Sequence, residues 1–240
     1  MSGGAGLIPR ECGECPLRTS SAVCRAADSN PPAFQKLLHR FLYQPRQIVF
    51  YEGHESLGLY VLCSGKAKLT SSSKSGHQRN VSIVGAGELI ERSGFCEGMV
   101  HAVTCETLEP SQVCLIERKP YLELLENNAP QAIELLQMVS GEDQREKLAL
   151  GRLPFCKTDE RLAAVLLDLG TRFGKQDVEG VKLEIRLTRE ELAELAGVAP
   201  ETLIRLLSRF KKERLVMAHG REITLLNPDR LRALADPLTS

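Results

Sequence analysis

The sequence lacks the features that would mark a membrane protein or a familiar kind of enzyme. No window approaches the roughly 18 uninterrupted apolar residues that a membrane span requires. The first residues lack the charged and apolar regions of a secretory signal, so we expect a cytoplasmic protein. No dinucleotide fingerprint, phosphate-binding loop or histidine-acid pair beside a nucleophile is present, and the five histidines are scattered. We therefore do not expect an enzyme, an iron-sulfur oxidoreductase included.

The chain also lacks a net charge, because 31 basic residues balance 31 acidic ones. This balance argues against nonspecific binding of polyanions by the whole surface. Residues 201–214 nevertheless carry five basic side chains against two acidic ones. Basic residues confined to one helix indicate a binding surface more specifically than an excess of basic residues over the whole protein would. At 240 residues, 42% of them hydrophobic, the chain has room for one large or two ordinary globular domains.

Cysteine, by contrast, is plentiful, with eight residues in the chain. Three of them, Cys12, Cys15 and Cys24, lie close together near the N-terminus. In a compartment that keeps thiols reduced, a clustered set is more often metal-binding or redox-active than a disulfide framework. Tetrahedral metal sites and iron-sulfur clusters normally take four ligands, so this group predicts a fourth partner elsewhere.

The remaining pattern predicts two domains joined by a helix. Residues 33–42 show helical spacing, and 45–117 consists of short alternating runs with glycine-bearing turns, which predicts an antiparallel sandwich or barrel. Residues 129–153 follow a three-and-four spacing typical of a helix that packs on another helix, although two seam positions, Asp143 and Glu146, are acidic. Either the apolar stripe lapses there, or a dimer helix carries built-in repulsion. Beyond Pro154 we expect a helix over 159–173, a strand over 181–187 and two further helices.

The stretch 187–210 is the most specific pattern in the sequence. Thr188 and Glu191 form the pattern of a capping box, Gly197 permits a tight turn, and Pro200 opens a second helix. On that helix the apolar residues face inward, while Glu201 and Arg205 lie together on the exposed N-terminal part, as in a recognition helix. Arginine can bind guanine and glutamate can accept from cytosine, whereas the lysines that follow suit phosphates. With residues 221–226 as the strand of a wing, this pattern predicts a DNA-binding helix-turn-helix.

At this point nearly the whole chain resembles the cyclic-AMP-receptor and fumarate-nitrate-reduction (CRP/FNR) superfamily of bacterial regulators. The run 60–65 followed by 87–90 is similar to the family's β-roll, 129–153 to its dimerisation helix, and 201–205 to its recognition motif. The resemblance implies an α+β fold with an N-terminal antiparallel β-roll, a cyclic-nucleotide-binding-like jelly roll. A long dimerisation helix and a C-terminal winged helix-turn-helix would follow it. The expected segments are a cysteine-rich stretch (1–30), a β-roll sensory domain (31–126), a dimerisation helix (127–154) and a DNA-binding domain (155–240).

The resemblance also implies the interacting residues. The residues expected at DNA are Glu201, Thr202, Ile204, Arg205, Ser208, Arg209, Lys211 and Lys212. Those expected in the dimer seam are Leu136, Val139, Asp143, Glu146 and Leu150. Ile204 departs from the oxygen-responsive branch, which usually has serine there, so the half-site sequence stays open. The implied partners are a palindromic promoter site in double-stranded DNA, a second copy of the chain and RNA polymerase.

The oxygen-sensing branch of the family implies a 4Fe-4S cluster held by Cys12, Cys15, Cys24 and one distant cysteine. Cys114 falls at the family's place for that ligand, with Cys105 and Cys96 as rivals. The eight residues between Cys15 and Cys24 exceed the spacing of the best-known members. Cys63 and Cys156 lie in apolar strings and are expected to be small core residues.

Other sensing chemistries remain open. Zinc could use the same four thiolates as a structural staple, and Cys12 could form a disulfide switch with Cys15 or Cys24. Cyclic nucleotide is the runner-up effector, because the nucleotide-binding members carry an Arg-Ser pair where this chain has Val100-His101. We therefore expect a regulator that senses oxygen, nitric oxide or redox state through a cluster that controls dimerisation.

Overall fold

The computed structural model describes residues 15, 17, 21–25, 31–72, 78–152 and 156–235, with side chains except at 31, 33, 78, 142 and 145–152. These residues form two compact units, Met1–Gln78 with Ser82–Glu146, and Arg79–Val81 with Lys147–Ser240. No helix in the described part of the chain is long and apolar enough to cross a membrane.

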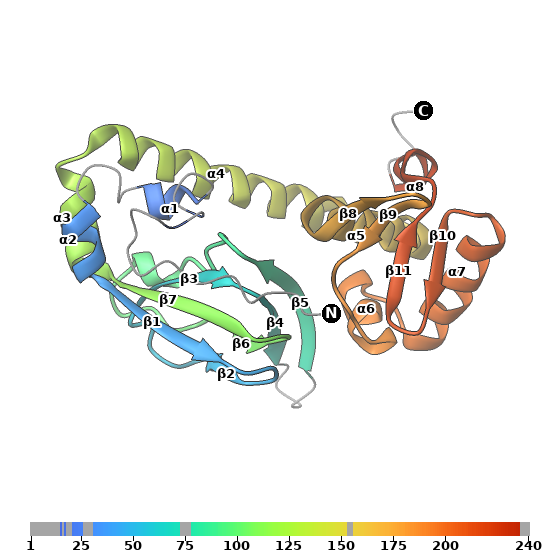
Figure 1. The fold of residues 1–240 in the computed structure, drawn as a ribbon, viewed down its shortest axis with the longest axis horizontal. Helices are drawn as coiled ribbons and strands as arrows, with labels where there is room; N and C mark the ends of the chain where they lie inside the picture. The colour runs from blue at the N-terminus through green and yellow to red at the C-terminus, as the bar shows by residue number, and fades with distance from the viewer. Residues whose placement is uncertain are drawn as a thin grey trace. The chain divides into compact units, whose positions relative to one another are not determined.

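The first unit contains two antiparallel sheets (Figure 1). One has the strand order β1-β7-β3 (Leu38–Tyr43, Ser111–Glu117, Gly58–Ser64). The other has the order β2-β6-β4-β5 (Ile48–Phe50, Thr104–Thr107, Lys66–Ser72, Gln78–Gly85), and a short 3-10 helix, η3 (Ser93–Phe95), precedes β6. Apolar side chains of both sheets, such as Tyr60, Leu69 and Cys105, form a core between them. This arrangement confirms the expected β-roll.

A second core covers the other face of the three-stranded sheet. It joins strands β3 and β7 to helices α1 (Ala22–Arg25), α2 (Pro31–Lys36), α3 (Arg118–Glu126) and α4 (Ala129–Arg152). Because both faces of β3 are buried, the strand reads as a nearly continuous apolar run, Leu59 to Leu62, rather than as an alternating one. Successive residues of β3 and β7 therefore point alternately into the two cores.

The predicted helix over 33–42 is wrong beyond Lys36. Leu38–Tyr43 is strand β1, which pairs with β7 in the register Leu38↔Ile116 to Tyr43↔Ser111. Phe41 and Leu42 are 44% and 74% exposed, so the helical apolar spacing does not correspond to a buried stripe. Pairing with β7 gives the backbone of these six residues hydrogen-bond partners, and this stabilisation outweighs the helical spacing of the apolar residues.

The second unit consists of helices around a four-stranded sheet of order β10-β11-β9-β8 (Figure 1). Its strands are β8 (Gly174–Asp177), β9 (Gly180–Leu183), β10 (Val216–His219) and β11 (Glu222–Leu225). Its helices are α5 (Thr158–Phe173), α6 (Arg189–Ala196), α7 (Pro200–Lys212) and α8 (Pro228–Ala235). The expected helix over 159–173 and the two later helices are confirmed, while the strand expected over 181–187 ends at Leu183.

Candidate functional site

Helices α6 and α7 form the predicted helix-turn-helix. Glu191 N–H donates to Thr188 Oγ1 at 3.1 Å and Thr188 N–H donates to Glu191 Oε2 at 2.8 Å, so the capping box has both of its bonds. Gly197 ends α6 with φ +63°, and its N–H donates to carbonyl oxygens of the last turn. That backbone angle favours glycine and produces the sharp change of direction before α7.

Helix α7 separates its apolar and polar residues cleanly. Leu203, Leu206, Leu207 and Phe210 are buried, which ties the helix to the domain core. The opposite face is exposed at Glu201, Ile204, Arg205, Ser208, Arg209, Lys211 and Lys212, and Thr202 is half-buried. The structure therefore places the sequence-predicted DNA-facing residues on one accessible surface. Ile204 is 54% exposed, an apolar group among polar ones.

The two arginines of this surface differ in their surroundings. Arg209 donates to Asp159 Oδ2 at 2.7 Å, and its guanidinium also lies 3.7 Å from Glu213 Oε1. No acidic group of the described residues lies within ion-pair distance of Arg205. Partial burial raises the pKa of the Asp159 carboxyl, but the hydrogen bonds from Arg209 and from backbone N–H groups outweigh it and leave that pKa below its ordinary value. Sequence reasoning did not identify Asp159, whose partner lies 50 residues away.

Strands β10 and β11 form the wing, in the register Val216↔Leu225 to His219↔Glu222. The sequence predicted only its second strand. Gly220 has φ +55° in the connecting turn, and the neighbouring Arg221 is exposed at the tip. The wing therefore carries an exposed cationic side chain at its tip, in the same unit as α7.

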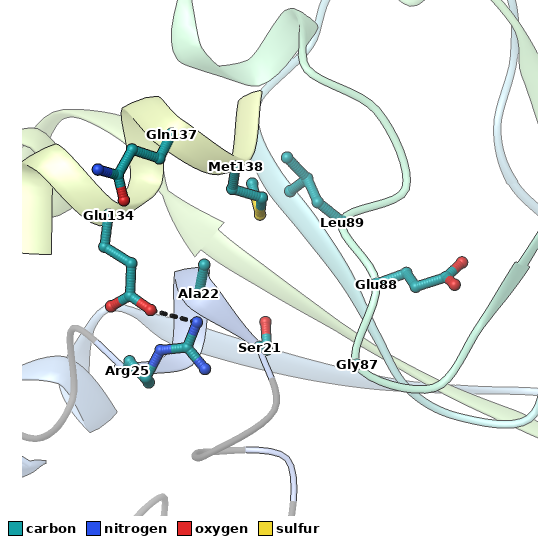
Figure 2. Close-up of a pocket in the computed structure, with 9 residues that line it drawn as sticks. All are labelled: Ser21, Ala22, Arg25, Gly87, Glu88, Leu89, Glu134, Gln137 and Met138. Carbon is teal, nitrogen blue, oxygen red and sulfur yellow. Dashed lines mark ion pairs between the residues drawn. The ribbon is translucent and has the colours of Figure 1, made fainter. Parts of the chain in front are cut away.

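In the first unit, helix α1 carries Cys24 and is held against α3 and α4. Tyr121 Oη donates to the carbonyl oxygen of Val23 at 3.2 Å, and Gln131 Nε2 donates to that of Ala22 at 3.4 Å. Arg25 forms an ion pair with Glu134 of α4 (Figure 2). Burial raises the pKa of the Tyr121 hydroxyl, with a smaller contribution from the nearby Cys24 thiol. Sequence reasoning missed these contacts because each joins residues far apart in the chain.

The ion pair borders a cavity of about 460 Å³ between α1, the turn at 87–89 and α4. Arg25 and Glu134 lie on one side of it, and Glu88 and Leu89 on the other (Figure 2). The turn at 87–89 belongs to the run 87–90, which resembles the family's β-roll in sequence. Ser21, Ala22 and Arg25 thus line the space between this turn and helix α4.

Strand alternation sorts the candidate fourth ligands. Cys114 pairs with Val61 across β7 and β3, and Val61 belongs to the core on which Cys24 packs. Cross-strand partners point to the same face of a sheet, so Cys114 lies on the face that α1 covers. Cys105 lies in the core between the two sheets and is fully buried. Burial, with contributions from Glu91 and Glu106, raises the pKa of the Cys105 thiol to about 12 and opposes formation of a thiolate.

The other cysteines have varied positions. Cys15 and Cys24 are half-buried, Cys96 is exposed, and Cys12 lies outside the described residues. The expectation that Cys63 and Cys156 are buried core residues is wrong, since both are partly exposed, and Cys63 forms a disulfide with Cys114. Within the described ranges, no group of three or more His, Cys, Asp or Glu side chains is arranged to hold a metal ion.

Helix α4 presents two different faces. Leu135 is buried, and Ala132 and Met138 pack against the helix-covered core. Ile133 and Leu136 are 56% and 65% exposed, Val139 is half-buried and Asp143 is exposed. One face of α4 therefore packs on the helix-covered core, while the expected seam residues Leu136 and Asp143 lie on the exposed side. The side chains of Glu146 and Leu150 lie outside the described set.

Comparison with known proteins agrees with this architecture. Residues 40–128 match the cyclic nucleotide-binding domain, and residues 160–234 match the Crp-like helix-turn-helix domain. The chain is 31% identical to the transcriptional activator protein Anr of Pseudomonas protegens over 79% of its own length and 77% of the relative's. The chain belongs to the CRP/FNR family of transcriptional regulators. It is therefore a DNA-binding regulator and not an enzyme.

One further relative and two solved structures extend the similarity. The fumarate and nitrate reduction regulatory protein of Vibrio cholerae is 28% identical over 98% of this chain and 93% of the relative. FixK2 from Bradyrhizobium japonicum has the same fold, with a TM-score of 0.71 at 22% identity over 82% of this chain and 96% of that one. A CooA mutant from Carboxydothermus hydrogenoformans gives a TM-score of 0.68 at 18% identity, over 83% of this chain and 88% of that one. The relationship in sequence and the likeness in fold thus cover both domains of this CRP/FNR regulator.

Proposed function

We propose that this regulator senses oxygen, nitric oxide or redox state through a 4Fe-4S cluster held by Cys12, Cys15, Cys24 and Cys114. The observation that carries the proposal is the position of Cys114 on the sheet face that α1 and Cys24 cover. The relatives named for fumarate and nitrate reduction, together with Anr, support the same branch of the family. When bound, such a cluster supplies a group whose integrity depends on oxidants.

The donor set fits a thiolate-bound cluster better than the alternatives do. Cys105 points into the opposite core, and its raised pKa disfavours the thiolate that a metal requires. Cys96 is exposed, and none of the described contacts of α1 involves it. Cys114 is only 4% exposed and has to be in the thiol form, free of its disulfide with Cys63, before it can act as a ligand.

Cyclic nucleotide is a weaker effector for this chain. At the place of the Arg-Ser pair of nucleotide-binding members, Val100 is exposed and His101 is 1% exposed. The His101 ring stacks on Phe50 at 3.7 Å between centroids, inside the β-roll. A buried imidazole fixed in this way does not replace a guanidinium that grips a phosphate. Sensing through the cysteines therefore accounts for more of the structure.

The chain's own residues supply a route from the cysteines to the dimer. Arg25 follows Cys24 directly and pairs with Glu134 on α4, whose exposed face includes Leu136. We propose that ligation of Cys24 and Cys114 fixes α1 on the sheet, and that the Arg25–Glu134 pair transmits this to α4. Two α4 helices would then pack along Leu136, Val139, Asp143, Glu146 and Leu150. Like charges at Asp143 and Glu146 oppose that packing, each by about 0.2 to 1 kcal/mol where exposed, until the helices are positioned.

A dimer would present two α7 helices to the half-sites of a palindrome. A monomer makes half of the phosphate and base contacts, so its affinity for the same site falls steeply. Arg205 and Glu201 are proposed to read bases, and Lys211 and Lys212 to contact phosphates. Contact with RNA polymerase, expected from the family resemblance, belongs to the same proposal.

The proposal is tested on full-length protein purified without air. We expect visible colour, about four iron and four sulfide per protomer, and binding to a palindromic duplex that is lost on exposure to air. Cys114→Ala is expected to abolish the cluster. Cys105→Ala is the matched control, because it removes the same atom from a buried strand position in the four-stranded sheet, and it should keep the cluster.

Two outcomes would contradict this function. If the protein is colourless, holds one zinc ion and binds DNA equally well in air, the cysteines form a structural zinc site and not a sensor. Loss of the cluster in Cys105→Ala, with retention in Cys114→Ala, would move the fourth ligand to the four-stranded sheet and the core between the two sheets.

A further inference from the structure

Cys63 and Cys114 are joined by a disulfide between strands β3 and β7, with their Cα atoms 6.3 Å apart. That separation lies in the ordinary range for disulfides, so no strand has to move to form the bond. Val61 pairs with Cys114 and Leu62 with Val113, after which the register shifts before Ser64. Cys63 sits at this irregularity, and the shift of register allows its side chain to reach a diagonal neighbour.

The disulfide uses the same sulfur that the proposed cluster needs. A sulfur in a disulfide has no thiolate to offer to iron, so the two bonding states of Cys114 exclude one another. We propose that Cys63 forms a reversible disulfide with Cys114 under oxidation and thereby locks the regulator in a form that cannot assemble its cluster. The lock rests on the proposed function, whereas formation of the disulfide does not.

The two sulfurs differ in access. Cys63 is half-buried, whereas Cys114 is 4% exposed. A small peroxide would therefore oxidise Cys63 first, giving a sulfenic acid and one water. The Cys114 thiol would then attack that sulfur, form the S–S bond and expel the oxygen as a second water. Two electrons pass in total from the two sulfurs to one peroxide molecule, and a dithiol reductant reverses the change.

The test starts from reduced, metal-free full-length protein in the absence of air. One sample receives a single equivalent of hydrogen peroxide and a second sample receives none. Both samples are then alkylated, digested and mapped by mass spectrometry. Parallel samples are desalted and mixed with ferrous iron and sulfide, before and after treatment with dithiothreitol. The wild type is compared with Cys63→Ser and with Cys156→Ser, a control that removes a partly exposed thiol from the other unit.

We expect a linked Cys63–Cys114 peptide in oxidised wild type and in Cys156→Ser. In both, peroxide should slow cluster assembly at least about tenfold, and dithiothreitol should restore it. Cys63→Ser should form no such peptide and should assemble its cluster at nearly the same rate before and after peroxide. Absence of the linked peptide, or equal assembly rates for oxidised and reduced wild type, would overturn the lock.

Failure of the proposed function gives a different result. If reduced wild type assembles no cluster although the linked peptide forms, the sensor proposal and the lock on it are overturned. The disulfide would then be supported as a thiol switch in its own right. If reduced wild type assembles a cluster and oxidised wild type does so equally fast, only the lock is overturned.

Discussion

The ion pair between Asp159 and Arg209 makes a quantitative prediction about DNA binding. Arg209 lies on the exposed face of α7, yet it donates to Asp159 on α5 at 2.7 Å, with side-chain exposures of 45% and 19%. The lowered pKa of Asp159 keeps its carboxylate charged at neutral pH. A phosphate that recruits Arg209 must therefore compete with a carboxylate that is already in place. Asp159→Asn should remove the nearer of the two carboxylates that hold the guanidinium, leaving Glu213 at 3.7 Å, and also remove a negative charge from that surface.

The size of the effect follows from the exposure of the pair. Partly exposed ion pairs contribute about 0.2 to 1 kcal/mol, which corresponds to roughly a 1.4- to 5-fold change in affinity per protomer. Two protomers on a palindrome square that factor, giving an increase in affinity of about 2- to 30-fold. The affinity should also fall more steeply as the salt concentration rises. Each additional phosphate contact makes the slope of log affinity against log salt concentration steeper by about one.

Fluorescence anisotropy on a labelled palindromic duplex, measured over a salt series, provides the assay. Asp229→Asn is the matched control, because it removes one carboxylate from the same unit, where Asp229 pairs with Arg232 on α8. Thermal unfolding of both variants checks that the loss of an acidic group from the first turn of α5 does not unfold the domain. If both variants gained the same affinity, the change in net charge alone would explain the effect. Weaker binding by Asp159→Asn would mean that Asp159 positions Arg209 for DNA instead of competing with it.

Four other predictions test separate parts of the structure. Arg205→Ala should lower affinity for the palindrome by about 1–3 kcal/mol per protomer and relax base preference, whereas Lys211→Ala should weaken all sequences alike in a competition assay with random DNA. Leu136→Glu should prevent dimerisation in analytical ultracentrifugation while the melting temperature changes little, because that side chain is 65% exposed; an unchanged dimer would exclude this face. Arg25→Ala should have the iron content of the wild type but a lower dimer fraction than the wild type. A normal dimer fraction in this variant would show that the Arg25–Glu134 pair does not couple α1 to dimerisation. His101 has a pKa lowered from 6.5 mainly by burial, so the unfolded state takes up the proton first and stability should fall as pH drops below about 6.5; His101→Gln should lose this trend in melts at about pH 7.5 and 5.5.

The DNA-binding unit could be predicted from the sequence because its signals are local. A capping box spans four residues, and the stripe of α7 repeats within two turns, so Thr188 and Leu203 are interpretable without knowledge of the fold. Strand β8 was missed for the opposite reason. Its residues Gly174–Asp177 are all exposed and none is a large apolar residue, and only pairing with β9 makes them a strand. The helix expected over 33–42 failed in the same way, since pairing with β7 determines Leu38–Tyr43.

The contacts that relate the cysteine segment to the long helix could not be predicted at all. Tyr121 is 98 residues from its acceptor Val23, and Arg25 is far from Glu134 in the chain. No periodicity encodes such pairs, because each depends on how helices α1, α3 and α4 pack in one shared core. The residue type indicated part of this arrangement, because a buried tyrosine hydroxyl needs a hydrogen-bond partner. The identity of the partner came only from the structure.

The choice among the distant cysteines shows where strand patterns reach their limit. Alternation does not tell which core Cys114 faces until its partner strands are known, because a strand that is buried on both faces has no polar side to orient it. The pairing of Cys114 with Val61 supplies the missing orientation. The same parity puts Cys63 on that face too, beside the proposed ligand. A strand pair that brings Cys114 to the cysteine segment therefore also brings it a competitor, and any account of cluster assembly in this chain has to include both bonds.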